Sequence, residues 1–305
     1  MGSIRPFALI ALAVCAVPLQ APAQSEPVLR VQVNLVRLLV TVKNAAGGIV
    51  SDLNRDDFAL FDNGVKQEVA FFEHHNEQPL WVSVLIDNSG STGIETRHEV
   101  DSVVSFLSAL LHEGNPSDSV ALYSFNWQVV LLSSFTRRVP YLERQLRNLK
   151  WEAGTSMYDA VWLASRDLDG RDGRHVMVIV TDGDDTTSSK DFNTALQAAQ
   201  FADTVIYPVV IVPVTNDAGR SIGGEHALAT YAQRTGGRIF TPSNGPELEQ
   251  SFTQLIHELR TQYLVGYYPR NVPPTSNPFH TVAVKLSRPG LRAITRTGYY
   301  GDAER

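Results

Sequence analysis

The chain has 305 residues, of which 43% are hydrophobic and 19% charged, and its formal net charge is −6. These values are typical of globular proteins, and the length allows one large domain or two modest ones. The sequence contains no basic block of the kind that follows nucleic-acid phosphates, so we expect no nucleic-acid partner.

The first 23 residues have the pattern of a secretory signal peptide. Arg5 precedes an apolar run, residues 7–17, that is too short to span a bilayer, and Ala21 and Ala23 supply the small residues of a cleavage site. We expect cleavage after Ala23 and export to the periplasm, the cell surface or the medium. A buried helix is the alternative, but a terminal apolar run preceded by Arg5 fits it less well.

The only cysteine of the chain, Cys15, lies within this segment. The mature protein therefore has no disulfide and no thiolate metal site. A lipoprotein with Cys15 as the lipidated residue is an alternative, although the apolar run continues past this position. No later segment is long and apolar enough to cross a membrane, so we predict no transmembrane segment in the mature chain.

The sequence has β character at both ends of the mature chain. Residues 24–78 contain short strand patterns around a hairpin turn, Asp62-Asn63-Gly64, and residues 262–305 contain further strands around a polar loop, residues 272–278. Small isolated hairpins are only marginally stable. We therefore expect the two segments to pair into one small β domain.

Residues 79–261 alternate between apolar strand patterns and amphipathic helix patterns. We expect strands at 80–87, 118–125, 128–135, 175–183, 204–212 and 238–242, and helices at 95–114, 141–149, 157–168, 191–202, 226–237 and 246–262. This alternation predicts an α/β fold with a doubly wound, mostly parallel sheet. In such sheets the binding site lies at the carboxyl ends of the strands, near the switch point in strand order.

Three polar groups occupy the positions where this rule expects a site. They are Asp87-Asn88-Ser89-Gly90-Ser91 after the first strand, Gly154-Thr155 before a helix, and Asp182-Gly183 after a later strand. Together they supply two carboxylates and three hydroxyls without Cys or His, an oxygen set that suits Mg²⁺, Mn²⁺ or Ca²⁺ rather than zinc. With only two carboxylates present, a cation here is suited to recruiting an acidic side chain from a protein partner.

Other readings of these residues remain open. The first group could be a capped turn, because Thr92 and Glu95 fit a capping box, or a metal site that has degenerated into a polar turn. Asp159 could support the metal loops by hydrogen bonding, or could be a first-turn helix acid. Asp185 could support the metal loops in the same way. With Asp184 it could instead bind a second cation or repel wrong partners, or both could be solvated loop charges.

The three groups together resemble the metal-ion-dependent adhesion site of von Willebrand factor A domains, and the element order extends the resemblance over residues 80–261. The resemblance implies that Ser89, Ser91 and Thr155 bind the metal, Mg²⁺ first, and that Asp87 and Asp182 bind it directly or through water. The chain also resembles a bacterial family of exported proteins related to this class, in the stretches "LNRDDFALFDNG", "LATYAQRTGGRIF" and "YLVGYYP".

We therefore expect an exported, non-enzymatic binding module of unspecified oligomeric state, with residues 125–127 as a candidate rim loop. A structural envelope subunit in which the metal only stabilises the fold is one alternative. A Mg²⁺-dependent hydrolase is another, but Ser89 stands where a known phosphotransferase pattern has its second aspartate. No Gly-x-Ser-x-Gly elbow follows a strand either.

Overall fold

The computed structural model describes residues 35–74, 78–90, 97–183, 185–211, 222–273 and 278–301, all within one compact unit, Asn34–Arg305. The predicted signal peptide, its cleavage site and Cys15 lie outside the described residues. Within these ranges, no helix combines the length and the apolar character that crossing a membrane requires.

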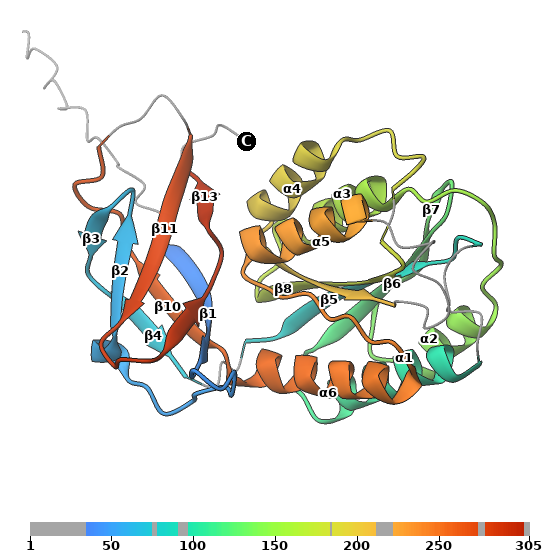
Figure 1. Ribbon diagram of the computed structural model, residues 1–305, viewed down its shortest axis with the longest axis horizontal. Helices are drawn as coiled ribbons and strands as arrows, with labels where there is room; N and C mark the ends of the chain where they lie inside the picture. Colours follow the sequence, from blue (N-terminus) through green and yellow to red (C-terminus); the bar gives the residue numbers. More distant parts are fainter. Residues whose placement is uncertain are drawn as a thin grey trace, which may run out of the picture. The chain divides into compact units, whose positions relative to one another are not determined.

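The α/β part of the chain is built around a central five-stranded sheet (Figure 1). Its strands are β5 (Leu80–Asp87), β6 (Ser119–Phe125), β7 (Val129–Thr136), β8 (Arg174–Thr181) and β9 (Thr204–Val210). The helices are α1 (Arg97–His112), α2 (Val139–Arg147), α3 (Met157–Leu168), α4 (Phe192–Phe201), α5 (Ile222–Thr235) and α6 (Gly245–Thr261).

The strand order of the central sheet is β7-β6-β5-β8-β9. Strands β6, β5, β8 and β9 pair in parallel, and only β7 runs antiparallel, to β6. From β5 the chain first builds one side of the sheet and then returns to build the other. The switch point therefore lies where the carboxyl ends of β5 and β8 are neighbours, and the predicted doubly wound, mostly parallel sheet is confirmed.

Helices cover both faces of this sheet (Figure 1). In β5, Val84 and Ile86 belong to the apolar cluster that includes α1, α2 and α6, whereas Leu85 belongs to the cluster of α3, α4 and α5. Because neighbouring side chains of a strand point to opposite faces, both kinds of position must be apolar. This explains why the strand reads as a continuous apolar run.

One predicted strand is wrong. Residues 238–242 form only a single bridge, between Phe240 and Val209, closed by hydrogen bonds of 2.8 Å on either side of Phe240. Pro242 has no N–H to continue the pairing, and α6 begins at Gly245. The segment is therefore too short to become a sixth strand.

Two four-stranded sheets are formed by the ends of the described chain, in the orders β12-β1-β10-β4 and β13-β11-β2-β3. The strands that precede the α/β part are β1 (Val36–Lys43), β2 (Phe58–Asp62), β3 (Val65–Gln67) and β4 (Phe71–Glu73), with a 3₁₀ turn at Arg55–Asp57. Those that follow it are β10 (Tyr263–Tyr267), β11 (Phe279–Leu286), β12 (Arg292–Ile294) and β13 (Gly298–Tyr300).

Each of these terminal sheets contains strands from both sides of the α/β part. Strand β1 pairs antiparallel with β10, and β2 pairs antiparallel with β11. This confirms the fold-class prediction of additional β structure formed from the N- and C-terminal segments. The hairpin between β2 and β3 turns at Asn63 and Gly64, both with positive φ (45° and 81°), as a two-residue turn of this kind requires.

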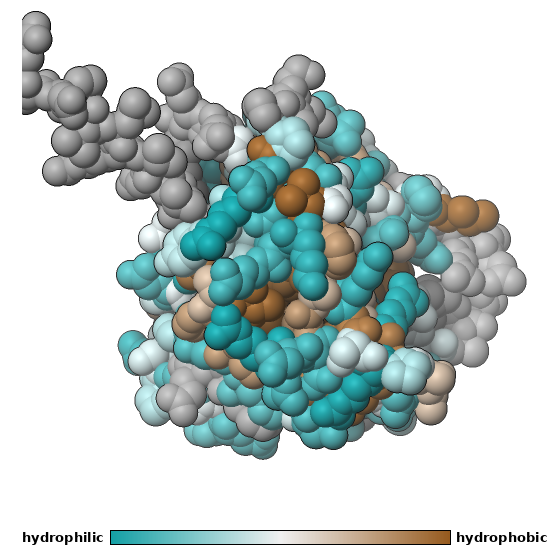
Figure 2. All heavy atoms as spheres, turned by 90° about the vertical axis from the view of Figure 1, so that its left-hand side faces the viewer, coloured by the Kyte–Doolittle hydropathy of each residue, from teal (hydrophilic) through white to brown (hydrophobic). Residues whose placement is uncertain are grey.

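The terminal sheets bury their apolar side chains in a cluster of their own, which includes Leu38, Leu60 and Tyr263. Figure 2 looks at the side of the molecule on which these sheets lie and shows a mostly hydrophilic surface with hydrophobic residues between the polar ones. Strand β11 has the alternating burial that such a half-covered sheet produces.

A buried carboxylate ties the terminal sheets to the α/β part. Glu258 of α6 is 0% exposed, and its Oε2 lies 3.2 Å from Lys43 Nζ of β1 and 2.8 Å from Arg238 Nε. Gln262, one turn further on, donates a hydrogen bond to Thr41 of β1 (3.1 Å). Because α6 runs directly into β10, these bonds hold β1 beside the strand with which it pairs.

Replacing Glu258 by alanine should lower the free energy of unfolding by about 3 kcal/mol, because Lys43 and Arg238 lose the buried carboxylate they share. Urea unfolding measures this loss. The matched control is Glu249→Ala on the exposed side of the same helix, which should change stability by less than about 0.5 kcal/mol. Equal stability of the two variants would contradict this role of Glu258.

Candidate metal-binding site

Three loops meet at the carboxyl edge of the central sheet. Ser89, after β5, forms a parallel bridge with Glu152, and the N–H of Glu152 donates to the carbonyl of Asn88 (3.2 Å). The N–H of Thr155 donates to Thr186 Oγ1 (3.0 Å), and the N–H of Thr186 returns a bond to the carbonyl of Thr155 (2.9 Å). The loops after β5, before α3 and after β8 are therefore hydrogen-bonded to one another.

The carboxylate of Asp87 lies at the end of β5 and is 0% exposed. Its Oδ1 accepts the N–H of Ser89 (2.9 Å), and its Oδ2 accepts the hydroxyl of Thr181 (2.6 Å), the last residue of β8. The hydroxyl oxygen of Thr181 in turn accepts the N–H of Gly183 (3.0 Å). This chain of bonds fixes the orientation of the Asp87 carboxylate and links it to the loop that carries Asp182.

Burial raises the pKa of Asp87 to about 7. The hydrogen bonds from Thr181 and Ser89 lower this pKa, and the charge of Asp182 raises it further. Asp182 directly follows Thr181, whose hydroxyl donates to Asp87, so the two aspartates lie at the ends of neighbouring strands. A positive charge at this point would stabilise both in their ionised forms.

The structure brings together the loops of four of the five residues predicted as metal ligands. Ser89 and Thr155 are buried there, and Asp182 is half-buried directly after β8. Ser91 lies outside the described residues.

Asp159 and Asp185 connect the loop after β8 to the start of α3. Asp185 Oδ2 accepts the N–H of Tyr158 (2.9 Å) in the first turn of that helix. Asp159 accepts the N–H groups of Ser189 (2.9 Å) and Lys190 (2.8 Å). Both carboxylates thus support the segment around Thr155 through backbone hydrogen bonds.

Three residues near the site have roles that the sequence does not reveal. Asn88 donates from Nδ2 to the carbonyl of Lys150 (2.6 Å), which ties the loop after β5 to the loop before α3. The indole N–H of Trp127 donates to Glu152 Oε2 (2.7 Å), while its side chain is 56% exposed. In the sequence, only Gly154, a residue typical of turns, indicates that the loop before α3 makes close contacts of this kind.

Position 154, in the loop before α3, requires glycine because of its backbone conformation and because Trp127 packs closely against it. Its φ is +86°, and a Cβ at this position would lie 3.0 Å from the Cβ of Trp127. A side chain here would strain the backbone and displace the tryptophan.

Comparisons with known proteins agree with the fold of the α/β part. Residues 82–184 match the family model of the von Willebrand factor type A domain. A von Willebrand factor type A structure from Catenulispora acidiphila superposes with a TM-score of 0.51 at 12% identity, covering 81% of this chain and 74% of that one. The α/β part of this chain therefore has the fold of a von Willebrand factor type A (VWA) domain, and residues 82–184 of it match that family.

Two further structures are similar at lower scores. One is an aerotolerance-related membrane protein from Bacteroides fragilis NCTC 9343 (TM-score 0.45, 17% identity, 59% of this chain and 99% of that chain). The other is the vWF domain of the type V pili tip protein Mfa5 from Porphyromonas gingivalis (TM-score 0.47, 13% identity, 60% and 95%). No curated protein matches the sequence.

The pKa of Asp87 predicts a pH-dependent stability in the presence of a chelator. The pKa of Asp87 is about 7 in the folded protein, against the ordinary value of 3.8 that applies to the unfolded chain. At a pH between these two values the folded state therefore holds one proton more than the unfolded state. The free energy of unfolding should therefore fall as the pH rises from about 4 to 7. Asp87→Asn lacks this titration.

The free energy of unfolding of Asp87→Asn, relative to that of the wild type, should therefore rise by up to about 4 kcal/mol between pH 4 and pH 8. Urea unfolding of both proteins over this pH range, with EDTA present, measures the difference. Parallel stability curves would contradict the raised pKa.

Proposed function

We propose that this protein is an exported binding protein whose VWA domain holds a divalent cation, Mg²⁺ before Mn²⁺ or Ca²⁺, at the carboxyl edge of its central sheet. The partner is a protein that contributes an acidic side chain to the cation. The observation that carries the proposal is the buried carboxylate of Asp87, bonded to Thr181 at the end of the adjacent strand β8, which Asp182 directly follows. The buried hydroxyl residues Ser89 and Thr155 lie in the loops of the same edge.

The residues present fit such a cation. Asp87, Ser89, Ser91, Thr155 and Asp182 would hold it, and they offer only hard oxygen donors. When bound, the cation supplies a positive centre that a carboxylate from the partner can contact. Thr181 and the N–H of Ser89 keep the carboxylate of Asp87 oriented, so this ligand is in place before the partner arrives.

The rim of the site supports a role in binding. Trp127 is exposed, yet its indole is fixed by Glu152, which lies beside Ser89. A large, immobilised aromatic side chain can contribute contact area with little loss of conformational entropy. We assign no catalytic residue, and we take export through the signal peptide of residues 1–23 as part of the proposal.

The cation site is tested first with the metal alone. Calorimetric titration with MgCl₂ should show binding to the wild type, and Asp87→Ala or Asp182→Ala should weaken it by at least about 100-fold, because each removes a charged ligand. The matched control is Asp56→Ala, an exposed aspartate of the terminal sheets, which should bind Mg²⁺ as the wild type does. Unchanged Mg²⁺ affinity in Asp182→Ala would reject the site.

The binding role is tested by a pull-down from the native cell envelope, done in Mg²⁺ and repeated in EDTA. Proteins retained by the wild type in Mg²⁺ should be lost in EDTA and with Asp87→Ala, and kept with Asp56→Ala. If EDTA lowers the melting temperature but leaves the same proteins bound, the cation is structural and the proposed contact is wrong.

A further inference from the structure

Residues 137–150, which contain α2, are basic although the chain as a whole is acidic. They include five basic residues and one acidic residue, whereas the whole chain has a net charge of −6. Helix α2 packs beside α1 on one face of the central sheet and buries Val139, Leu142 and Leu146 there (Figure 1). The basic side chains are left on the side of the helix that faces solvent, where Arg138 and Arg144 are exposed.

These two arginines are held beside the same aromatic ring. The guanidinium carbon atoms of Arg138 and Arg144 lie 5.9 Å and 5.8 Å from the centre of the Tyr141 ring. The three positions are spaced three residues apart, so their side chains gather along one side of α2. Contact with an aromatic ring restrains an arginine side chain but leaves its charge and its N–H donors available.

No acidic side chain neutralises this pair of arginines. Within the described ranges, neither guanidinium lies at ion-pair distance from a carboxylate, because the carboxylates close to α2 are used by Arg147. Arg147 binds Asp101 of α1 at 2.6 Å and Glu143 of α2 at 2.9 Å. Two like charges held beside one ring repel each other, and a carboxylate from another molecule would relieve this repulsion.

Helix α2 leads directly to the metal loops. It ends at Arg147, and three residues later the carbonyl of Lys150 accepts a hydrogen bond from the side chain of Asn88 (2.6 Å), in the loop after β5. From Arg144 to Lys150 the chain advances at most about 15 Å, at 1.5 Å per helical residue and roughly 3.5 Å per residue beyond the helix. Lys150 is exposed as well, so positive charge continues from Arg144 to the edge of the proposed cation site.

We propose that Arg138, Tyr141 and Arg144 form a second contact for the protein partner of the cation site, and that they bind carboxylates of an acidic segment of that partner. The proposal rests on the proposed function, because the acidic side chain at the cation determines which molecule reaches α2. A guanidinium binds a carboxylate through two parallel hydrogen bonds, and the Tyr141 ring restrains both guanidiniums before the partner arrives.

The geometry also gives the spacing of acidic groups in the partner. At about 3.4 Å per residue, an extended segment of about five residues spans the distance from the metal loops to Arg144. We therefore expect a second acidic group about five residues from the one that contacts the cation. The net charge of −6 opposes binding to a long polyanion or an anionic membrane, whereas a short acidic segment meets mainly the local positive charge.

The test measures binding of a fluorescein-labelled peptide of eight glutamates by fluorescence anisotropy, at about 20 mM NaCl, where screening is weak. In EDTA the wild type should bind the peptide. The double variant Arg138→Gln/Arg144→Gln should bind it at least about fivefold more weakly, because two exposed ion pairs are lost. Equal affinity of the two proteins, or no binding by the wild type, overturns the proposal.

The matched control is Arg234→Gln/Arg292→Gln, which removes the same charge from exposed positions of α5 and β12. It should keep the wild-type affinity for the peptide. If it loses as much affinity as the α2 variant, the peptide responds only to net charge and the proposal is overturned. All four substitutions change exposed side chains, and the melting temperature of each variant checks its fold.

Vesicles of phosphatidylglycerol are the second probe. The wild type should bind the peptide and not the vesicles. Binding of the vesicles without binding of the peptide, lost in Arg138→Gln/Arg144→Gln, would assign this face of α2 to a membrane and overturn the proposal.

Repeating the peptide titration in MgCl₂ separates this contact from the proposed cation. The wild type should bind the peptide more tightly than in EDTA, and Asp182→Ala should lose this gain while keeping its affinity in EDTA. If Mg²⁺ has no effect but the arginine variant still binds more weakly, the cation contact fails and the arginine contact is supported. If Mg²⁺ strengthens binding equally in the wild type and the arginine variant, and both bind alike in EDTA, only the arginine contact is overturned.

Discussion

The carboxylate of Asp87 is buried at the edge where β5 and β8 lie side by side, and the surrounding loops are arranged around it. An ionised group in this position is unfavourable unless hydrogen bonds or positive charge compensate it. Thr181 and the backbone of Ser89 provide part of that compensation, and the neighbouring Asp182 acts against it. The remaining demand for positive charge is the physical reason for proposing a cation here.

The loops that hold this edge are joined by contacts between residues far apart in the chain. Asn88 reaches the loop before α3, and Asp185 reaches the first turn of that helix from the loop after β8. Most of these bonds involve backbone groups, so the edge is pre-arranged rather than dependent on long, flexible side chains. A rigid edge lowers the entropy that a binding partner would otherwise have to overcome.

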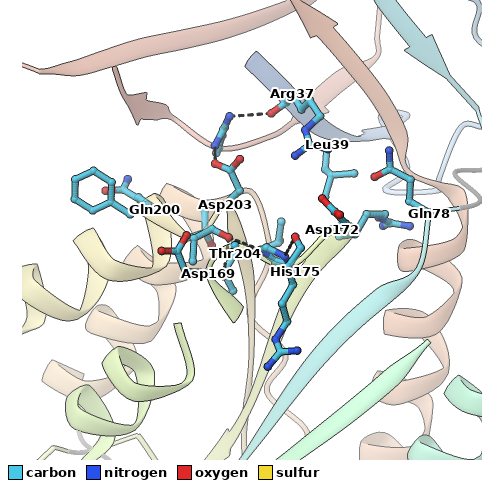
Figure 3. Close-up of a pocket in the computed structure, with 18 of the residues that line it drawn as sticks. Arg37, Leu39, Gln78, Asp169, Asp172, His175, Gln200, Asp203 and Thr204 are labelled. Atoms are coloured by element: carbon cyan, nitrogen blue, oxygen red, sulfur yellow. Dashed lines mark hydrogen bonds and ion pairs between the residues drawn. The ribbon is translucent and has the colours of Figure 1, made fainter. Parts of the chain in front are cut away.

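The other end of the central sheet is organised by different charges. Glu258, between Lys43 and Arg238, connects α6 to β1, and a cavity lined by Gln200 and Arg37 lies where terminal strands meet β8 and β9 (Figure 3). Strand β8 therefore runs from a junction rich in arginine to an edge rich in carboxylates.

Periodicity and turn residues sufficed to predict the parallel sheet, the covering helices and the Asn63-Gly64 hairpin, because these depend on neighbours in sequence. For the same reason they predicted Asp87 at the end of a strand and Thr155 and Asp182 in loops. The predicted strand at 238–242 failed because Pro242 and the start of α6 limit its pairing. Only the tertiary structure decided the role of Asn88, the fixed indole of Trp127 and the cavity at the amino ends of β8 and β9. Each of these depends on side chains that lie tens of residues apart and meet only once the sheet and its loops have formed.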